Sequence, residues 1–187
     1  TPISSLMGWV EILKDNYPED DVIDEMSNDV KRLEMIAERF SKIGSKPEAK
    51  PSDIIMVVDR VVEYIDHRTS SDVSLYFDKP LHPVVVSINT SLFEWVIENL
   101  CKNAVDAMEG KGSIFLNIIE EETMVAVEVK DTGKGIRHKN LKNVFKPGFT
   151  TKKRGWGLGL SLAKRIVEEY HKGRIYVKES TLGKGTT

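Results

Sequence analysis

The sequence predicts an α+β fold in which an N-terminal helical hairpin is followed by an α/β sandwich, a sheet covered by helices. Apolar residues repeat at helical spacing through residues 1–44, and a polar stretch with two prolines follows them. From residue 52 onward, helical and alternating patterns are mixed in the way typical of α+β domains. We therefore expect a hairpin over residues 1–46, a linker over 47–51 and a second domain over 52–187.

The hairpin should consist of two amphipathic helices separated by a break at Asn16-Tyr17-Pro18-Glu19-Asp20. The apolar positions are Ile3, Leu6, Val10 and Leu13 in the first helix, and Met26, Val30, Leu33, Ala37 and Phe40 in the second, with Ile36 and Ile43 beside them. A stripe that repeats every 3.5 residues is typical of a coiled coil or bundle, and two helices cannot bury it alone. We expect a homodimer through residues 1–44 that forms a four-helix bundle. The alternative is a hairpin packed on its own globular domain.

The elements of the second domain follow in order along the sequence. Ser52 is expected to cap a helix with Ile54, Val58, Val61 and Ile65 on one face. Short strands at 73–77 and 84–88 lead to a helix at about 90–108, whose core stripe should be Leu92, Val96, Leu100 and Ala104. Strands at 114–119 and 124–130 should pair around a turn at 120–123, and a helix at about 158–170 and a strand at 174–178 follow.

Composition excludes several classes of protein. A net charge of −2 argues against a general nucleic-acid binder, and no apolar run approaches the roughly 20 residues needed to cross a bilayer. The single cysteine, Cys101, fits a reducing cytoplasm and should be a buried small residue rather than a nucleophile. Because the sequence opens on Thr1-Pro2 without a methionine and ends just after a predicted turn, we expect a fragment of a longer protein, with any membrane part outside it.

Two asparagines point to a cation. Asn99 and Asn103 lie four residues apart and therefore share one face of their helix, beside the core stripe. Asparagine is a mediocre helix residue, so two on one face suggest a role. A side-chain carbonyl suits a hard cation such as Mg²⁺, and the amide could lie near phosphate. The alternative is a pair of ordinary surface residues.

Two glycine-containing motifs point to a nucleotide. Asp131-Thr-Gly133-Lys-Gly135 follows an alternating strand, and its aspartate can accept a hydrogen bond from the exocyclic amine of adenine. Gly155-Trp-Gly157-Leu-Gly159 opens a helix, where unsatisfied N–H groups and the helix dipole favour phosphate. It matches neither the Rossmann nor the P-loop pattern. A solvent turn and a flexible loop are the alternatives.

Between these two motifs, the irregular stretch 144–154 ends on Lys152, Lys153 and Arg154. Basic residues beside a phosphate site would neutralise triphosphate charge, and a long segment with proline and glycine suggests a lid. The alternative is a solvated basic loop. Taken in order, the motifs predict an ATP·Mg²⁺ site.

The same residues resemble the boxes of sensor histidine kinases of two-component signalling, whose ATP-binding domain has the Bergerat fold shared with gyrase and mismatch-repair ATPases. Residues 98–107 are similar to the N box, 131–135 to G1, 145–149 to the F box, 155–160 to G2 and 182–186 to G3. The resemblance implies that Asn103 binds Mg²⁺ with help from Asn99, that Asp131 selects adenine, and that 145–154 form the lid. The nucleotide contacts that it implies are Lys102, Gly133, Gly135, Phe145, Thr151, Lys152, Gly155, Gly157, Leu158, Gly159 and Thr186.

The front end resembles the dimerisation and phosphotransfer hairpin of the same family, whose first helix opens His-Glu-x-x-Thr-Pro. The match begins at Thr1-Pro2, so the phosphoacceptor histidine would lie upstream, and Thr1 corresponds to the threonine that assists dephosphorylation of the response regulator. Four histidines are outside such a context and should be ordinary surface or turn residues: His67, His82, His138 and His171. A final strand is expected after residue 187, and Trp156, in a usually smaller position, should pack on the lid or on the nucleotide.

The resemblance implies ATP-dependent phosphorylation of a histidine of the same or the partner subunit, followed by transfer to the receiver domain of a response regulator. A gyrase-type ATPase is one alternative, although such relatives have a glutamate base four residues before the Mg²⁺ asparagine, where this sequence has Asn99. A nucleotide-gated interaction module without transfer is the other alternative.

Overall fold

The structure is a computed structural model, and it describes residues 2–18, 20, 22–27, 29–30, 48–152 and 155–187. The chain divides into two compact units, Thr1–Pro47 and Glu48–Thr187. Among the described residues, no helix has the length and apolar character that a bilayer crossing requires.

The first unit contains α1 (Pro2–Asn16) and helical residues 22–27 and 29–30. Val10, Ile23 and Val30 are buried against one another, with Met7 packed beside them. Leu6 is 45% exposed, so Met7 takes the place that the sequence pattern gave to Leu6. The expected apolar positions from Leu33 to Ile43 lie outside the described residues, as does Thr1, and the four-helix bundle stays a prediction because it needs a second copy.

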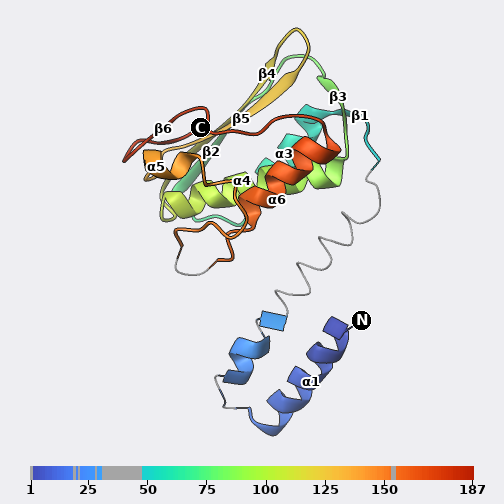
Figure 1. Cartoon of the computed structure of the whole chain (residues 1–187). Helices are drawn as coiled ribbons and strands as arrows, with labels where there is room; N and C mark the ends of the chain where they lie inside the picture. Colours follow the sequence, from blue (N-terminus) through green and yellow to red (C-terminus); the bar gives the residue numbers. More distant parts are fainter. Residues whose placement is uncertain (1, 19, 21, 28, 31–47, 153–154) are drawn as a thin grey trace. The chain divides into compact units, whose positions relative to one another are not determined.

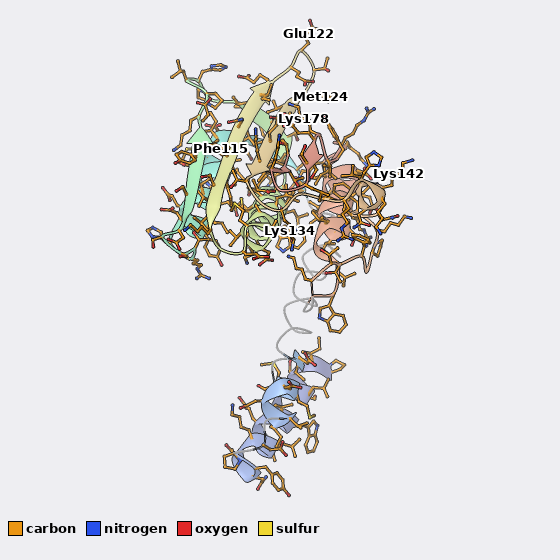
Figure 2. The ribbon with its side chains drawn as sticks, turned by 90° about the vertical axis from the view of Figure 1, so that its left-hand side faces the viewer. Phe115, Glu122, Met124, Lys134, Lys142 and Lys178 are labelled. Atoms are coloured by element: carbon orange, nitrogen blue, oxygen red, sulfur yellow. The ribbon has the colours of Figure 1, made fainter. Side chains whose placement is uncertain are left out.

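The second unit is built on a three-stranded sheet with the strand order β2 (Val73–Asp78), β4 (Gly112–Glu120) and β5 (Val125–Asp131). β2 runs parallel to β4, and β5 runs antiparallel to it in a register that pairs Ile114 with Asp131. The expected hairpin between β4 and β5 is therefore confirmed, and Glu122 and Met124 mark its tip (Figure 2). This register places Asp131 at the end of the strand, where the glycine turn begins.

A second, two-stranded sheet pairs β1 (Lys50–Asp53) antiparallel with β3 (Val85–Ile88). The prediction that Ser52 caps the next helix was wrong, because Ser52 lies in β1 and Asp53 is the cap. The Asp53 carboxylate accepts the backbone N–H of Ile55 at 3.1 Å and that of Val84 at 3.2 Å, so it joins the helix start to the chain ahead of β3.

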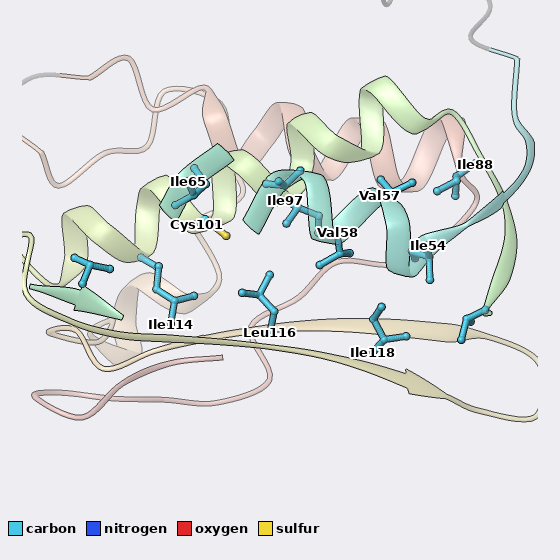
Figure 3. Close-up of a cluster of buried hydrophobic side chains, with 14 of the residues drawn as sticks. Ile54, Val57, Val58, Ile65, Ile88, Ile97, Cys101, Ile114, Leu116 and Ile118 are labelled. Atoms are coloured by element: carbon cyan, nitrogen blue, oxygen red, sulfur yellow. The ribbon is translucent and has the colours of Figure 1, made fainter. Parts of the chain in front are cut away.

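Two helices, α3 (Ile54–Asp66) and α4 (Thr90–Ala107), pack against one another and cover one face of the sheet (Figures 1 and 3). Ile114, Leu116 and Ile118 alternate along β4 and project toward these helices (Figure 3). The predicted stripe of α3 is confirmed. In α4, Leu100 is only partly buried, and Ile97 and Cys101 take its place in the core, at 1% and 0% exposure.

The C-terminal part contains α5 (His138–Leu141), α6 (Gly159–Arg165), the π-helical turn η1 (Ile166–Tyr170), and the short pair β6 (Ser180–Thr181) and β7 (Gly185–Thr186). The strand predicted at 174–178 is wrong, because residues 172–179 have no regular secondary structure. A strand needs a hydrogen-bonded neighbour. Only the end of this stretch has one: Lys178 N–H donates to the Thr187 carbonyl at 2.9 Å, and Thr187 N–H donates to the Glu179 carbonyl at 2.8 Å.

Candidate functional site

Helix α4 carries both asparagines that the sequence singled out, and its N-cap sets where the helix begins. The Asn89 side chain accepts the backbone N–H of Leu92 at 3.1 Å and so starts the helix at Thr90. With the buried stripe of α4 packed on α3 and the sheet, Asn99 and Asn103 lie partly buried along its edge. The shared face predicted from their spacing is thus present, and each makes a different contact.

Asn99 packs against the first residue of α6. A Cβ atom placed on Gly159 would lie 2.4 Å from Asn99 Oδ1, so no larger residue fits there without displacing the asparagine. The Nδ2 atom of Asn99 is buried, and no hydrogen-bond partner for it exists among the described residues. A buried amide without a partner is costly, and it is a group that a ligand acceptor oxygen would satisfy.

The loop before α6 is joined to the turn at residues 146–149. Gly157 has φ +64°, and a Cβ there would lie 2.5 Å from the Phe149 carbonyl oxygen. The Gly148 N–H donates to the Gly157 carbonyl at 3.0 Å. Of the other predicted residues of this loop, Gly155 and Leu158 lie at the surface and Phe145 is half-buried. Trp156 is 60% exposed.

Asp131 is the one buried charged side chain among the described residues, at 8% exposure. Its carboxylate accepts the backbone N–H of Gly133 at 2.7 Å and also that of Thr186. Burial raises the pKa of Asp131 above its ordinary value, and these two backbone hydrogen bonds oppose that rise. A carboxylate has four acceptor positions, so Asp131 keeps capacity for a further donor.

The turn that follows Asp131 is held between α4 and the C-terminal pair. The Lys134 N–H donates to the Ala107 carbonyl at the end of α4, at 3.0 Å, and the Lys134 carbonyl accepts the Gly183 N–H at 3.0 Å. Gly133 and Gly135 flank Lys134 in this turn. A Cβ on Gly185 would lie 1.8 Å from the Asp131 carbonyl oxygen, so β7 lies directly against the end of β5.

The basic residues predicted to contact phosphate make different contacts in the structure. The Lys152 Nζ lies 2.9 Å from Asn103 Oδ1 and 2.5 Å from Asp106 Oδ2. Lys102 forms an ion pair with Glu98 on α4. Thr151 is exposed, and Lys153 and Arg154 lie outside the described residues. Among the residues that the structure describes, no group of three or more His, Cys, Asp or Glu side chains could hold a metal ion.

Sequence reasoning missed two side chains that build this region. Asp106, the partner of Lys152, lies three residues after Asn103, and this helical spacing could have identified it. His171 was expected at the surface or in a turn, yet it is half-buried, with its ring edge-on to Phe93. Its Nε2 accepts the Asn89 N–H at 3.0 Å, and its Nδ1 lies 3.0 Å from the Ile166 carbonyl, so it joins the end of η1 to the start of α4.

The predicted site residues therefore meet α4 at three successive positions along its C-terminal half. The loop before α6 meets Asn99, the segment around Lys152 meets Asn103, and the turn after Asp131 meets the end of the helix. Thr186 belongs to the third group through its bond to Asp131. Lys102 does not join them.

Comparison with known proteins identifies similar chains. The family model described as histidine kinase-, DNA gyrase B- and HSP90-like ATPase matches residues 89–187. Sporulation kinase E of Bacillus subtilis is 31% identical over 194 residues, covering 99% of this chain and 26% of that protein. Sensor histidine kinase ZraS of Salmonella typhimurium is 28% identical, with coverages of 98% and 41%. The chain thus spans less than half the length of these relatives.

Solved structures agree with the fold. The catalytic domain of histidine kinase ThkA, in a nucleotide-free form, is 26% identical, with a TM-score of 0.64 over 74% of this chain and 91% of that one. Full-length ShkA in complex with AMPPNP gives a TM-score of 0.75 over 99% of this chain and 41% of that chain, at 20% identity. The latter supports the fold alone.

Proposed function

The chain belongs to the family of histidine kinase-, DNA gyrase B- and HSP90-like ATPases, and from this premise we propose that it is the kinase core of a cytoplasmic sensor histidine kinase. The observation that carries the proposal is the convergence of the two asparagines, the buried aspartate and the glycine loop on α4. In this proposal the ATP-binding domain phosphorylates a histidine upstream of Thr1, which later passes the phosphoryl group to the receiver domain of a response regulator.

Three features of the site fit ATP. The spare acceptor capacity of the Asp131 carboxylate suits the adenine amine, with Gly133 and Gly135 beside the base. Gly157 and Gly159 let the loop and the first residue of α6 pack closely against Phe149 and Asn99. The first N–H groups of a helix have no helical acceptor, and here they would meet phosphate oxygens. The orphaned Asn99 amide would donate to such an oxygen. Phe145, Thr151, Gly155 and Leu158 complete the proposed contacts.

Mg²⁺ also fits the donor set. The Asn103 carbonyl oxygen already accepts a cationic group, the Lys152 ammonium, so its position suits a hard cation. When bound, Mg²⁺ would neutralise charge on the phosphate oxygens, and the protein would mainly position the nucleotide, as is general in phosphoryl transfer. Lys102, although predicted as a contact, pairs with Glu98 and is the weakest member of the set.

The gyrase-type alternative is disfavoured by one residue identity and one contact. Asn99 stands where a glutamate base would be needed, and an amide cannot accept a proton at neutral pH. The neighbouring Glu98 is engaged by Lys102 on the helix surface. The protein therefore lacks a positioned general base at this point of the described site, and a histidine acceptor, which supplies its own nucleophile, suits it better than water.

The first unit supports a dimer. Among its described residues the buried cluster consists of Val10, Ile23 and Val30, and several large apolar side chains are exposed: Leu6, Trp9, Ile12, Val22 and Met26, at 44–65%. A second copy would cover them in the proposed four-helix bundle. Thr1, just after the proposed acceptor, would assist dephosphorylation of the regulator.

Two measurements test the proposal. A chain extended upstream should form acid-labile, alkali-stable phosphate from ATP, and replacing the upstream histidine should abolish it. The 187-residue chain should bind AMPPNP but turn over ATP only slowly. Fast hydrolysis without an acceptor would establish the ATPase alternative, and binding without transfer by the extended chain would establish the interaction module.

A further inference from the structure

The Lys152 ammonium is hydrogen-bonded to Asn103 Oδ1, the oxygen atom that the proposed function assigns to Mg²⁺ as a ligand. Its ammonium donates to Asn103 Oδ1 at 2.9 Å and to Asp106 Oδ2 at 2.5 Å, so the two α4 side chains together form a small cation-binding site. Asn103 and Asp106 are three residues apart and therefore lie on the same side of the helix. The site is filled by a cation from the protein itself.

We infer that Lys152 is a built-in substitute for Mg²⁺, which the metal displaces from Asn103 when the metal–nucleotide complex binds. This inference rests on the proposed function, because it takes Asn103 as the metal ligand. An ammonium and a divalent ion repel each other at a few ångströms, so the Asn103 carbonyl cannot serve both. The binding of one cation therefore requires the departure of the other.

The contact is weak enough to be exchanged. The Lys152 side chain is 40% exposed and that of Asp106 is 55% exposed, so solvent screens the ion pair. The flexible lysine stem lets the ammonium move without a change in α4. Once displaced, the ammonium is next to a bound triphosphate, and the segment at residues 146–152 is no longer tied to α4 through this side chain. Metal binding and release of this segment are thereby coupled.

The coupling predicts how each variant responds to the metal. In Lys152→Met no ammonium competes with Mg²⁺ for Asn103. Mg²⁺ should therefore increase the AMPPNP affinity of this variant by a larger factor than it does in the wild type. Without Mg²⁺, the same variant should bind AMPPNP more weakly, because the wild-type lysine partly replaces the missing cation. Since exposed ion pairs have small net effects, each change should be about two- to fivefold.

Matched control variants distinguish the loss of the Lys152–Asn103 contact from the mere loss of one positive charge. Lys142→Met removes an exposed lysine ahead of this segment and should leave the Mg²⁺ enhancement unchanged. Lys152→Arg keeps a donor for Asn103 and should behave nearly as the wild type. AMPPNP affinities of the 187-residue chain and its variants would be measured by calorimetry in EDTA and in saturating Mg²⁺. An equal Mg²⁺ enhancement in Lys152→Met and wild type would overturn the inference.

A second measurement observes the lysine directly. Hydrogen-bonded lysine ammonium groups are visible by ¹H–¹⁵N NMR, and we expect one signal in the wild type that Lys152→Met lacks. AMPPNP with Mg²⁺ should shift or remove it, whereas AMPPNP in EDTA should leave it in place. Persistence of the signal in the Mg²⁺ complex would refute displacement. Absence of AMPPNP binding, or of any effect of Mg²⁺ on it, in the wild type would instead refute the proposed function.

Discussion

Replacement of Asp131 by asparagine tests the proposed adenine contact most directly. The aspartate already accepts two backbone N–H groups, from Gly133 at 2.7 Å and from Thr186, and adenine would bring a third donor. A carboxamide offers one acceptor oxygen and an NH₂ group, so in Asp131→Asn at least one of the three donors faces another donor. The variant keeps the shape of the side chain and loses half of its acceptor positions.

The size of the effect follows from that count. A hydrogen bond to a charged group contributes about 1.5–3 kcal/mol, so ATP affinity should fall roughly ten- to hundredfold. The fold should survive, with unfolding free energy lowered by no more than about 1–2 kcal/mol, because one of the two backbone donors can still be satisfied. Asp78→Asn, at the exposed end of β2, is a matched control and should leave both quantities unchanged.

The assay compares ATP with ITP, which has a carbonyl group in place of the adenine amine. Wild-type protein should prefer ATP strongly, and Asp131→Asn should reduce or reverse the preference, as measured by calorimetry, with urea unfolding as the check on folding. The reasoning fails if the folded variant binds ATP as the wild type does, or if it loses affinity for ATP and ITP equally.

Three further predictions each rest on the packing or burial of one residue. Gly157→Ala should weaken triphosphate binding at least tenfold and lower stability by about 1–3 kcal/mol in urea titrations, because its Cβ would meet backbone at 2.5 Å; Gly8→Ala, with open space around it, should not destabilise the chain. Burial lowers the pKa of His171 below its ordinary 6.5, so the stability it contributes is complete above about pH 6.5 and is lost as the pH falls toward the folded-state pKa. His171→Gln should flatten unfolding free energy against pH over this range, and an unchanged slope would contradict the assignment. Burial raises the pKa of Cys101 to about 12 at 0% exposure, so iodoacetamide should label it only on unfolding, and fast labelling of the native chain by mass spectrometry would disprove it.

Local patterns predicted most of the second unit. The alternation in β4 and β5 and the apolar repeat of α3 arise because one face of each element is buried. Such a pattern can be recognised from residues that are close together in the sequence. The spacing of Asn99 and Asn103 is equally local, so their shared face was predictable. The glycine loop before α6 likewise indicated correctly that a helix starts there.

Most of the errors in the second unit share a cause, because they depend on a partner distant in the sequence. β1 is polar and contains Pro51, and only its pairing with β3 makes it a strand. The stretch 174–178 alternates well, but a strand requires a neighbour that the alternation does not supply. His171 gives no local sign that Asn89 donates to it, and the contact of Lys152 with Asn103 joins segments that no periodicity connects.

The contact of Gly185 with the end of β5 implies an order of assembly. The Asp131 carboxylate is oriented by an immediate neighbour and by Thr186, far along the chain, and closing so long a loop is slow compared with local structure formation. During synthesis, the helices and the sheet can form before residues 185–186 emerge, whereas the carboxylate that we propose to select the base is completed only afterwards. A nucleotide that needs this carboxylate therefore binds only the finished domain, and cellular ATP would stabilise finished molecules by mass action while leaving partly folded ones unprotected.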